Sequence, residues 1–323
     1  MKTKHNCFFV FMGVHLLFLC DVAAQSHISQ YQSVSKYVGK GYTAALDTAK
    51  LKITYSLHYV PDSLSSNRVM KDRKVLLIGD KIYHFFSDYI RQADSVLTAD
   101  FDKGKVSAPI KRASDIQGEA FDLYINYPNV GKQTVIESIA TLSVYQYEEP
   151  VQTLLWTIGQ DTCTILNYPC QKATTYFRGR EWEVWFCIAI PIDAGPWKLH
   201  GLPGLILKAA DSKNHYVFEC IGIEQLRKTK EPILMQIKYR NNCDFLKCTR
   251  EEYRKAQKQF YDNYVNSLLA MGINIFVQDD AGNTVEKLFT PNKRYEERGA
   301  MWTTIIKASD RYRKIPYNPI ELE

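Results

Sequence analysis

The residues of this chain that could do chemistry gather around a Gly- and Pro-rich segment near its middle. Asp193, His200, Asp211 and His215 lie within 23 residues, and carboxylates and imidazoles at such spacing could supply a general base and its orienting partner. Nucleophilic catalysis also requires a positioned nucleophile, and no GxSxG, HExxH or Cys-with-flanking-Gly signature is present. The sequence therefore keeps a peptidase or esterase near this segment as an alternative and assigns no catalytic residue.

The chain lacks the sequence patterns that hold a metal or a nucleotide. It contains no CxxC, and the histidines beyond residue 24 show no ligand spacing, so no metal is expected. No Gly-rich strand-to-helix loop appears, so no cofactor is expected. A formal net charge of +6 without a concentrated basic face argues against a nucleic-acid partner.

The same Gly- and Pro-rich segment also offers side chains for binding. Trp197, Lys198 and His200 lie inside it and Trp185 shortly precedes it; the sequence predicts these four as candidate ligand- or partner-binding residues. Aromatic residues make up 13% of the chain, which suits an aromatic-lined groove for an apolar or peptide ligand. The alternatives are that these rings form the core and that the loop merely crosses a sheet edge.

The backbone of this segment is specified by its glycines and prolines. Leu202-Pro203-Gly204-Leu205 has the composition of a type II turn, because Pro fixes φ and Gly accepts the positive φ that follows. A strand-like run, LILKAA, leaves that turn. The residues predicted to set this path are Gly195, Pro196, Gly201, Leu202, Pro203, Gly204, Leu205 and Ile206.

Six cysteines follow residue 24, and an even number in an exported protein favours disulfides. Residues 170–187 predict a hairpin around an Arg178-Gly179 turn, in which paired residue numbers sum to 357. Cys170 and Cys187 face each other in that register, so the geometry predicts a disulfide between them. A turn shifted by one residue would separate the two thiols, and Cys243 with Cys248 is a second, local candidate.

The elements around this segment predict a mainly β (α+β) fold. Residues 51–59 alternate apolar and polar side chains, which is the period of a half-buried strand. Similar runs recur with turn residues between them, which favours an antiparallel meander: a curved sheet or a half-barrel. Residues 249–271 predict a late amphipathic helix that begins after Thr249 and covers one face of the sheet. A shorter helix is predicted over 87–98, with Ser87 as its cap.

The ends of the chain predict export. Residues 1–24 combine two lysines, an apolar run and the small residues Val22-Ala23-Ala24, which is typical of a cleaved signal peptide. Lipidation at Cys20 is the alternative. We therefore expect a polar lead-in over 25–46, a β-rich domain over 47–280, and a basic, aromatic tail over 281–323 that docks on the domain. The predicted location is the periplasm or the outer membrane.

A resemblance to a known family rests on motifs in the middle of the chain. Tyr168–Ala173, Phe177–Arg180, Gly195–Lys198 and Gly201–Leu207 occur in an order and spacing that resemble the GLPGLI (Porph_ging) family of exported Bacteroidota proteins. The resemblance implies export and a shared fold, and it supplies no reaction or catalytic residue. The predicted function is a ligand- or partner-binding protein, a carrier or an accessory to an outer-membrane receptor or secretion component, rather than an enzyme.

Overall fold

The computed structural model describes residues 43–63, 69–92, 121–139, 143–226, 231–236, 245–270, 273–288, 302–307 and 317–323. The predicted signal peptide over 1–24 and most of the predicted lead-in lie outside these residues, as does Cys243. Within the described ranges, no helix is both long and apolar enough to cross a membrane.

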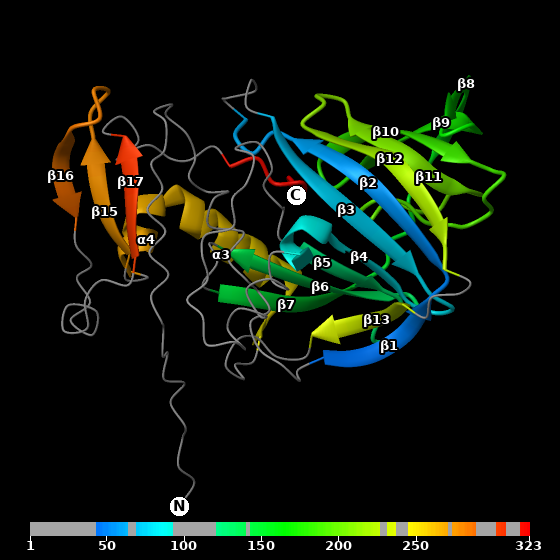
Figure 1. The fold of residues 1–323 in the computed structure, drawn as a ribbon, viewed down its shortest axis with the longest axis horizontal. Helices are drawn as coiled ribbons and strands as arrows, with labels where there is room; N and C mark the ends of the chain where they lie inside the picture. Colours follow the sequence, from blue (N-terminus) through cyan, green and yellow to red (C-terminus); the bar gives the residue numbers. More distant parts are fainter. Residues whose placement is uncertain are drawn as a thin grey trace, which may run out of the picture.

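The main element of the fold is a twelve-stranded sheet that curves strongly from one end to the other (Figure 1). Ten of its eleven neighbouring pairs are antiparallel, and only β14 runs parallel to its neighbour, β7. The strands in spatial order are β14 (Leu246–Lys247), β7 (Ser143–Pro150), β6 (Lys132–Ile139), β5 (Phe121–Ile125), β4 (Tyr83–Ser87), β3 (Met70–Ile78), β2 (Leu51–Tyr59), β12 (Tyr216–Gln225), β11 (Leu205–Asp211), β10 (Arg180–Cys187), β9 (Tyr168–Phe177) and β8 (Thr157–Ile165).

This topology confirms the predicted meander. Strands β2 to β7 follow one another both in sequence and in space, and so do strands β8 to β12. The two meanders join where β12 pairs with β2, with Tyr216 opposite Tyr59. The predicted mainly β fold with a curved sheet and a late helix is confirmed. The prediction succeeds because alternating side chains and frequent turns favour pairing between antiparallel strands that follow one another in the sequence.

Two small sheets, the helices α3 and α4, and a short helical segment over residues 88–92 complete the described fold. A three-stranded sheet lies apart from the main sheet, beyond the end of α3 (Figure 1), and contains one parallel pair, β15 with β17. The elements are β1 (Thr43–Ala49) paired with β13 (Glu231–Gln236), β15 (Ile273–Gln278), β16 (Thr284–Leu288), β17 (Trp302–Lys307), α3 (Arg250–Asp262) and α4 (Tyr264–Ala270). Strand β1 begins at Thr43, so regular structure starts inside the predicted lead-in.

Helix α3 begins as the sequence predicts. Thr249 accepts a hydrogen bond from the Glu252 backbone N–H while the Glu252 side chain accepts from the Thr249 backbone, so both halves of a capping box are present. The predicted single helix is interrupted at Asn263, whose φ of −124° and ψ of 40° are not helical. Of the predicted helix over 87–98, residues 88–92 are described and helical, and Ser87 Oγ accepts from the Ile90 N–H at 3.2 Å.

The large sheet is apolar on both faces over part of its area. One face carries the main core, which includes Tyr55, Phe85 and Trp182 and is covered by Tyr253 and Phe260 of α3. On the opposite face, β1 and β13 cover strands β3 to β7: Ile233 packs among Val75 and Leu77, and Met235 packs on residues of β5 to β7. Helix α3 and the β1–β13 pair therefore lie on opposite faces of the strands that carry the site described below.

The hairpin of β9 and β10 has the predicted register. Lys172 pairs with Trp185 and Phe177 with Arg180, around a turn in which Arg178 and Gly179 both have positive φ. The predicted Cys170–Cys187 disulfide is wrong, because both residues are free thiols. Cys163 of β8 also lies opposite Cys170, and burial, together with the neighbouring Cys187 and Cys163 thiols, raises the pKa of Cys170 to about 12.

The turn before β11 also differs from its prediction. Gly201, with φ of 92°, and Trp197, with φ of 56°, have positive φ in this segment, whereas Gly204 does not. The type II turn over residues 202–205 is therefore wrong. Gly204 is required for a different reason: a Cβ atom there would lie 2.1 Å from the Cys187 carbonyl oxygen. Gly204 is therefore needed where the backbone before β11 passes close to the backbone at the end of β10.

Replacing Gly204 with Ala should lower the free energy of unfolding by about 1–3 kcal/mol, because the added methyl group overpacks a backbone contact that cannot move aside. Urea unfolding measures the loss. Gly159→Ala is the matched control, because a Cβ at residue 159 meets nothing closer than 3.6 Å. Equal stability of the two variants would contradict the close-approach explanation.

Candidate functional site

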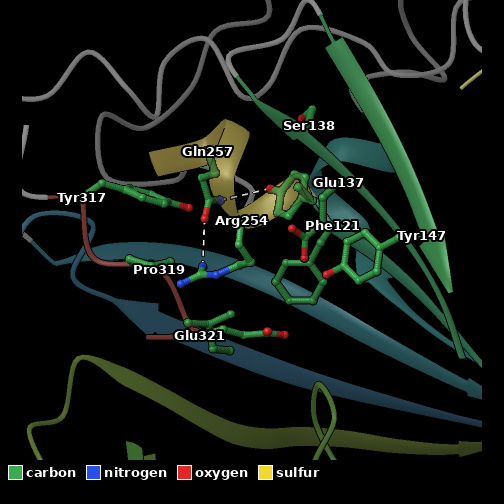
Figure 2. Close-up of a pocket in the computed structure, with 11 residues that line it drawn as sticks. Phe121, Glu137, Ser138, Tyr147, Arg254, Gln257, Tyr317, Pro319 and Glu321 are labelled. Atoms are coloured by element: carbon green, nitrogen blue, oxygen red, sulfur yellow. Dashed lines mark hydrogen bonds between the residues drawn. The ribbon is translucent and has the colours of Figure 1, made fainter. Parts of the chain in front are cut away.

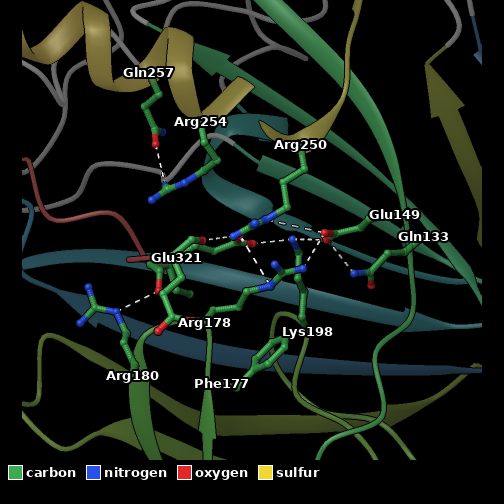
Figure 3. A network of polar contacts seen from close by, with 12 residues as sticks. Gln133, Glu149, Phe177, Arg178, Arg180, Lys198, Arg250, Arg254, Gln257 and Glu321 are labelled. Carbon is green, nitrogen blue, oxygen red and sulfur yellow. Dashed lines mark hydrogen bonds and ion pairs between the residues drawn. The ribbon is translucent and has the colours of Figure 1, made fainter. Parts of the chain in front are cut away.

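Five charged side chains from distant parts of the chain meet beside the main core (Figure 3). Glu149 comes from the end of β7, Arg178 from the β9–β10 turn, Lys198 from the Gly- and Pro-rich loop, Arg250 from the first residue of α3, and Glu321 from residues 317–323. We call these five residues the ion cluster. The Lys198, Glu149 and Glu321 side chains are 2%, 6% and 5% exposed, so the charges are almost fully removed from water.

The two carboxylates of the ion cluster share their cations. Lys198 Nζ contacts Oε1 of both Glu149 and Glu321. Arg178 Nη2 lies 2.7 Å from Glu149 Oε2, and Arg250 Nη2 lies 2.6 Å from Glu321 Oε2. Gln133 Nε2 donates to Glu149 Oε1 at 2.8 Å. Three cations thus face two carboxylates, so the cluster carries a net positive charge.

The electrostatics of the ion cluster fix the protonation of Glu321. Burial by itself would raise the pKa of this carboxyl, but Lys198, Arg250 and Arg178 outweigh burial and lower the pKa to about 2. A carboxyl with that pKa is ionised throughout the neutral range and is a poor proton donor or acceptor there. Glu321 therefore acts as a fixed counter-charge.

A small pocket lies next to the ion cluster, between strands β5 to β7, helix α3 and residues 317–321 (Figure 2). Its cavity volume of about 30 Å³ accommodates about one water molecule. We call it the polar pocket. Its lining combines rings with polar groups: Phe121, Glu137, Ser138, Tyr147, Tyr253, Arg254, Gln257, Tyr317, Pro319, Ile320 and Glu321.

Glu137 is the second carboxylate of the polar pocket. It projects from β6 on the same face as Tyr147 of the neighbouring β7, and it is hydrogen-bonded to the Tyr253 hydroxyl. Burial, with the Glu137 charge adding to it, raises the pKa of Tyr147 and of Tyr253 well above the ordinary value. Both phenols stay protonated, so they can donate hydrogen bonds to a carboxylate or a ligand.

Amide and guanidinium groups from α3 complete the lining of the polar pocket. Gln257 Nε2 donates to the Tyr253 hydroxyl at 3.1 Å, and Arg254 Nη1 donates to Gln257 Oε1 at 2.9 Å. Both side chains come from one face of α3, because residues three apart lie on the same side of a helix. The pocket therefore offers two carboxylates, hydroxyl groups and N–H donors within a small space.

The structure separates the predicted binding residues from one another. Trp197 is 1% exposed and packs on Phe177 and Trp182, with ring centroids 5.4 and 5.6 Å away. Lys198 belongs to the ion cluster. The His200 carbonyl accepts a hydrogen bond from Trp156 Nε1 at 2.8 Å. Trp185 is half-buried and lies under Lys172, on the face of β10 opposite to that of Trp182. These positions make no common groove.

The acids near the Gly- and Pro-rich loop have separate structural partners. Asp193 Oδ1 accepts from the Gly201 backbone N–H, and Asp211 pairs with Arg180 at 2.7 Å. Among the described residues, no group of His, Cys, Asp and Glu has the arrangement of a metal site.

Sequence reasoning missed Glu137, Glu149 and Glu321. None of the three belongs to a recognisable catalytic motif. Within the ion cluster, the cations that pair with Glu149 and Glu321 lie 29 to 143 residues away in the sequence. The available signal was indirect. Charged residues at apolar-face positions of a strand, such as Glu137 between Val135 and Ile139, indicate a buried polar site.

Comparison with known proteins identifies the class of domain. Residues 86–249 match the family described as N-glycanase peptide, N-terminal domain. This range spans just over half of the chain, and the chain therefore belongs to that family. No curated protein matches the chain at a significant level.

Two solved structures of PNGF-II, in the P21 and C2 space groups, are similar to the chain at 14% identity, with TM-scores of 0.41 and 0.42. In each comparison 64% of this chain is covered. The chain spans 32% of the length of those solved chains, about a third.

The family match corrects two predictions. The resemblance to the GLPGLI family is wrong, because the family whose model matches residues 86–249 is a different one. The prediction of a non-enzymatic carrier or accessory protein is wrong as well, because the matching family is described as the N-terminal domain of an N-glycanase, and an N-glycanase is an enzyme.

Proposed function

We propose that this protein is an amidase of the N-glycanase type, which hydrolyses the amide bond between an asparagine side chain and an N-linked glycan. Membership of the N-glycanase N-terminal domain family carries the proposal. The polar pocket supports it, because sugars are bound by combinations of aromatic rings and hydrogen-bonding groups, and the pocket offers both.

The two carboxylates of the polar pocket suit different tasks. Glu321 is held ionised by the ion cluster, with a pKa of about 2, and stabilises the positive charge around it. Glu137 contacts Tyr253 and faces a cavity with room for a water molecule. We assign to Glu137 the role of general base, and to Tyr147 and Tyr253 the role of hydrogen-bond donors that position it.

The reaction follows from these roles. Glu137 takes a proton from water as the water oxygen attacks the side-chain carbonyl carbon of the glycosylated asparagine. The carbon–nitrogen bond then breaks, and the proton passes to the leaving nitrogen. The products are an aspartate side chain and a glycosylamine, and the carboxylate of Glu137 is regenerated. Gln257 and Arg254 provide N–H donors for the carbonyl oxygen or for sugar hydroxyls.

The test is the conversion of a defined N-glycopeptide by the purified full chain. Mass spectrometry in heavy-oxygen water should show aspartate at the glycosylation position with one labelled oxygen atom. Glu137→Gln should lower the rate by about 10²–10⁴-fold, the usual contribution of a general base. Glu219→Gln is the matched control, because Glu219 is an exposed acid on β12.

Two results would overturn different parts of the proposal. If the wild-type chain forms no aspartate, the amidase activity is wrong. If aspartate forms at the same rate in wild type and in Glu137→Gln, the activity stands and the polar pocket is not its site.

A further inference from the structure

Residues Tyr317–Glu323, which we call the strap, lie along the main sheet and are bound there largely through their backbone. Arg180 is the main anchor. Its Nε donates to the Ile320 carbonyl at 2.9 Å, and its Nη2 donates to the Pro319 carbonyl at 2.6 Å and to Asn318 Oδ1 at 2.7 Å. Arg180 Nη1 donates to Asp211 Oδ2 at 2.7 Å, so Asp211, at the end of β11, fixes the orientation of the Arg180 guanidinium.

Asn318 is the second anchor of the strap. Its backbone N–H donates to the Pro61 carbonyl at 3.0 Å, and its side-chain Nδ2 donates to the Val60 carbonyl at 2.6 Å. The hydroxyl of Tyr216 donates to the Asn318 carbonyl at 2.9 Å. Every polar group of Asn318 is therefore paired, with Arg180, with Tyr216 or with the two residues that follow β2.

The surface beneath the strap is shaped to receive it. A Cβ atom at Gly179 would lie 2.7 Å from Leu322 Cβ, so only glycine leaves room for the strap at the β9–β10 turn. The Leu322 N–H donates to the Arg178 carbonyl at 3.0 Å. Glu321 enters the ion cluster, where Lys198, Arg178 and Arg250 surround its carboxylate.

The strap also forms one wall of the polar pocket, through Tyr317, Pro319, Ile320 and Glu321. With this wall in place the cavity measures about 30 Å³, whereas pockets that bind small organic ligands measure about 300–1,000 Å³. A sugar residue can enter only after a wall moves. The strap is held by hydrogen bonds and ion pairs, which water can replace when the segment leaves, and by the apolar contacts of Ile320 and Tyr317.

We propose that the surface formed by Arg180, Gly179 and the three cations of the ion cluster is a peptide-binding groove, with the strap as its exchangeable ligand. Arg180 and Tyr216 recognise the strap backbone, and Lys198, Arg178 and Arg250 recognise the carboxylate of Glu321. Release of the strap opens the polar pocket. This last step rests on the proposed amidase function, whereas the binding and exchange of the strap do not.

Amide hydrogen exchange of the full chain tests the release of the strap. The Asn318 and Leu322 amides should exchange through a local opening, faster than the amides of the paired strands β2 and β12. Asn318→Ala should accelerate strap exchange by about tenfold or more, because it removes two hydrogen bonds, and leave β2 and β12 unchanged. Asn283→Ala, an exposed asparagine in the β15–β16 turn, is the matched control. Strap amides that exchange only together with β2 and β12 would overturn the proposal.

A peptide added in trans tests the specificity of the groove. The probe is Tyr-Asn-Pro-Ile-Glu-Leu-Glu, and the comparison peptide carries Gln at the position of Glu321. The full chain with Asn318→Ala and Glu321→Gln should bind the first peptide at least about tenfold more tightly than the second, because charged hydrogen bonds are lost. The wild-type chain should bind neither, because its own strap competes at an effective concentration of order mM.

The two proposals fail separately. Equal binding of both peptides, or binding of neither by the double variant, would overturn the peptide-binding groove whatever the enzyme assay shows. Strap exchange and selective peptide binding without formation of aspartate from a glycopeptide would leave the groove intact and remove only the amidase.

Discussion

Replacing Lys198 with Met should lower the free energy of unfolding by about 3–5 kcal/mol, the usual cost of removing one partner from a buried ion pair. Lys198 Nζ is the group that joins Glu149 to Glu321. Without it, Oε1 of Glu321 loses its charged partner in a position that is 5% exposed. The methionine side chain fills nearly the same volume, so the loss reports the charge rather than a cavity. Urea unfolding, followed by circular dichroism, measures it.

A surface lysine provides the control for this prediction. Lys172 pairs with Glu183 at 2.8 Å and with Asp161 at 3.6 Å on the outer face of β9, where solvent screens the charges. Lys172→Met should therefore be much less destabilising than Lys198→Met. Similar losses for the two variants would show that the ion cluster contributes no more than an exposed pair.

Replacing Trp197 with Ala should also lower the free energy of unfolding by about 3–5 kcal/mol, because it leaves a large cavity in the main core. Trp197 is 1% exposed and contacts Phe177 and Trp182. Trp185→Ala should be less destabilising, because Trp185 is only half-buried on the other face of β10. If Trp185→Ala were the more destabilising of the two, the assignment of Trp197 to the core would be wrong.

The backbone conformation of Trp197 predicts a further difference, between the alanine and glycine variants at this position. Its φ of 56° lies in the left-handed region, which is costly for a residue with a Cβ atom and not for glycine. Trp197→Gly should therefore be as stable as Trp197→Ala or more stable, although glycine normally costs about 0.5–1 kcal/mol relative to alanine within regular structure. A glycine variant less stable than the alanine variant would contradict the strained backbone. Both variants are measured by the same urea titration.

The strands and their neighbours were largely predictable. The alternating run over 51–59 became β2 with unchanged bounds, and the Arg178-Gly179 turn set the register of β9 and β10. Such predictions succeed because period and turn chemistry act over a few residues. The resemblance to the GLPGLI family failed because it rested on short motifs, whereas residues 86–249 match the N-glycanase N-terminal domain family.

The candidate site was not predictable in the same way. Glu149 and Lys198 are separated by 49 residues, and Lys198 and Glu321 by 123. Trp197 and Lys198 are adjacent and were both predicted as binding residues, yet Trp197 packs in the apolar core and Lys198 belongs to the ion cluster. Side chains of neighbouring loop residues can point in different directions, so adjacency in the sequence did not predict that Trp197 and Lys198 have different surroundings.

By itself the sequence determined a mainly β meander, the hairpin register and the start of the late helix, because each depends on side-chain period, turn residues or a cap within a few positions. Only the tertiary structure decided which charges meet, since Glu149, Arg178, Lys198, Arg250 and Glu321 come together through the curvature of the sheet and the docking of α3 and the strap. Burial then set the properties of these groups, lowering the pKa of Glu321 to about 2 through its cations. That environment is made by packing, which no local pattern encodes.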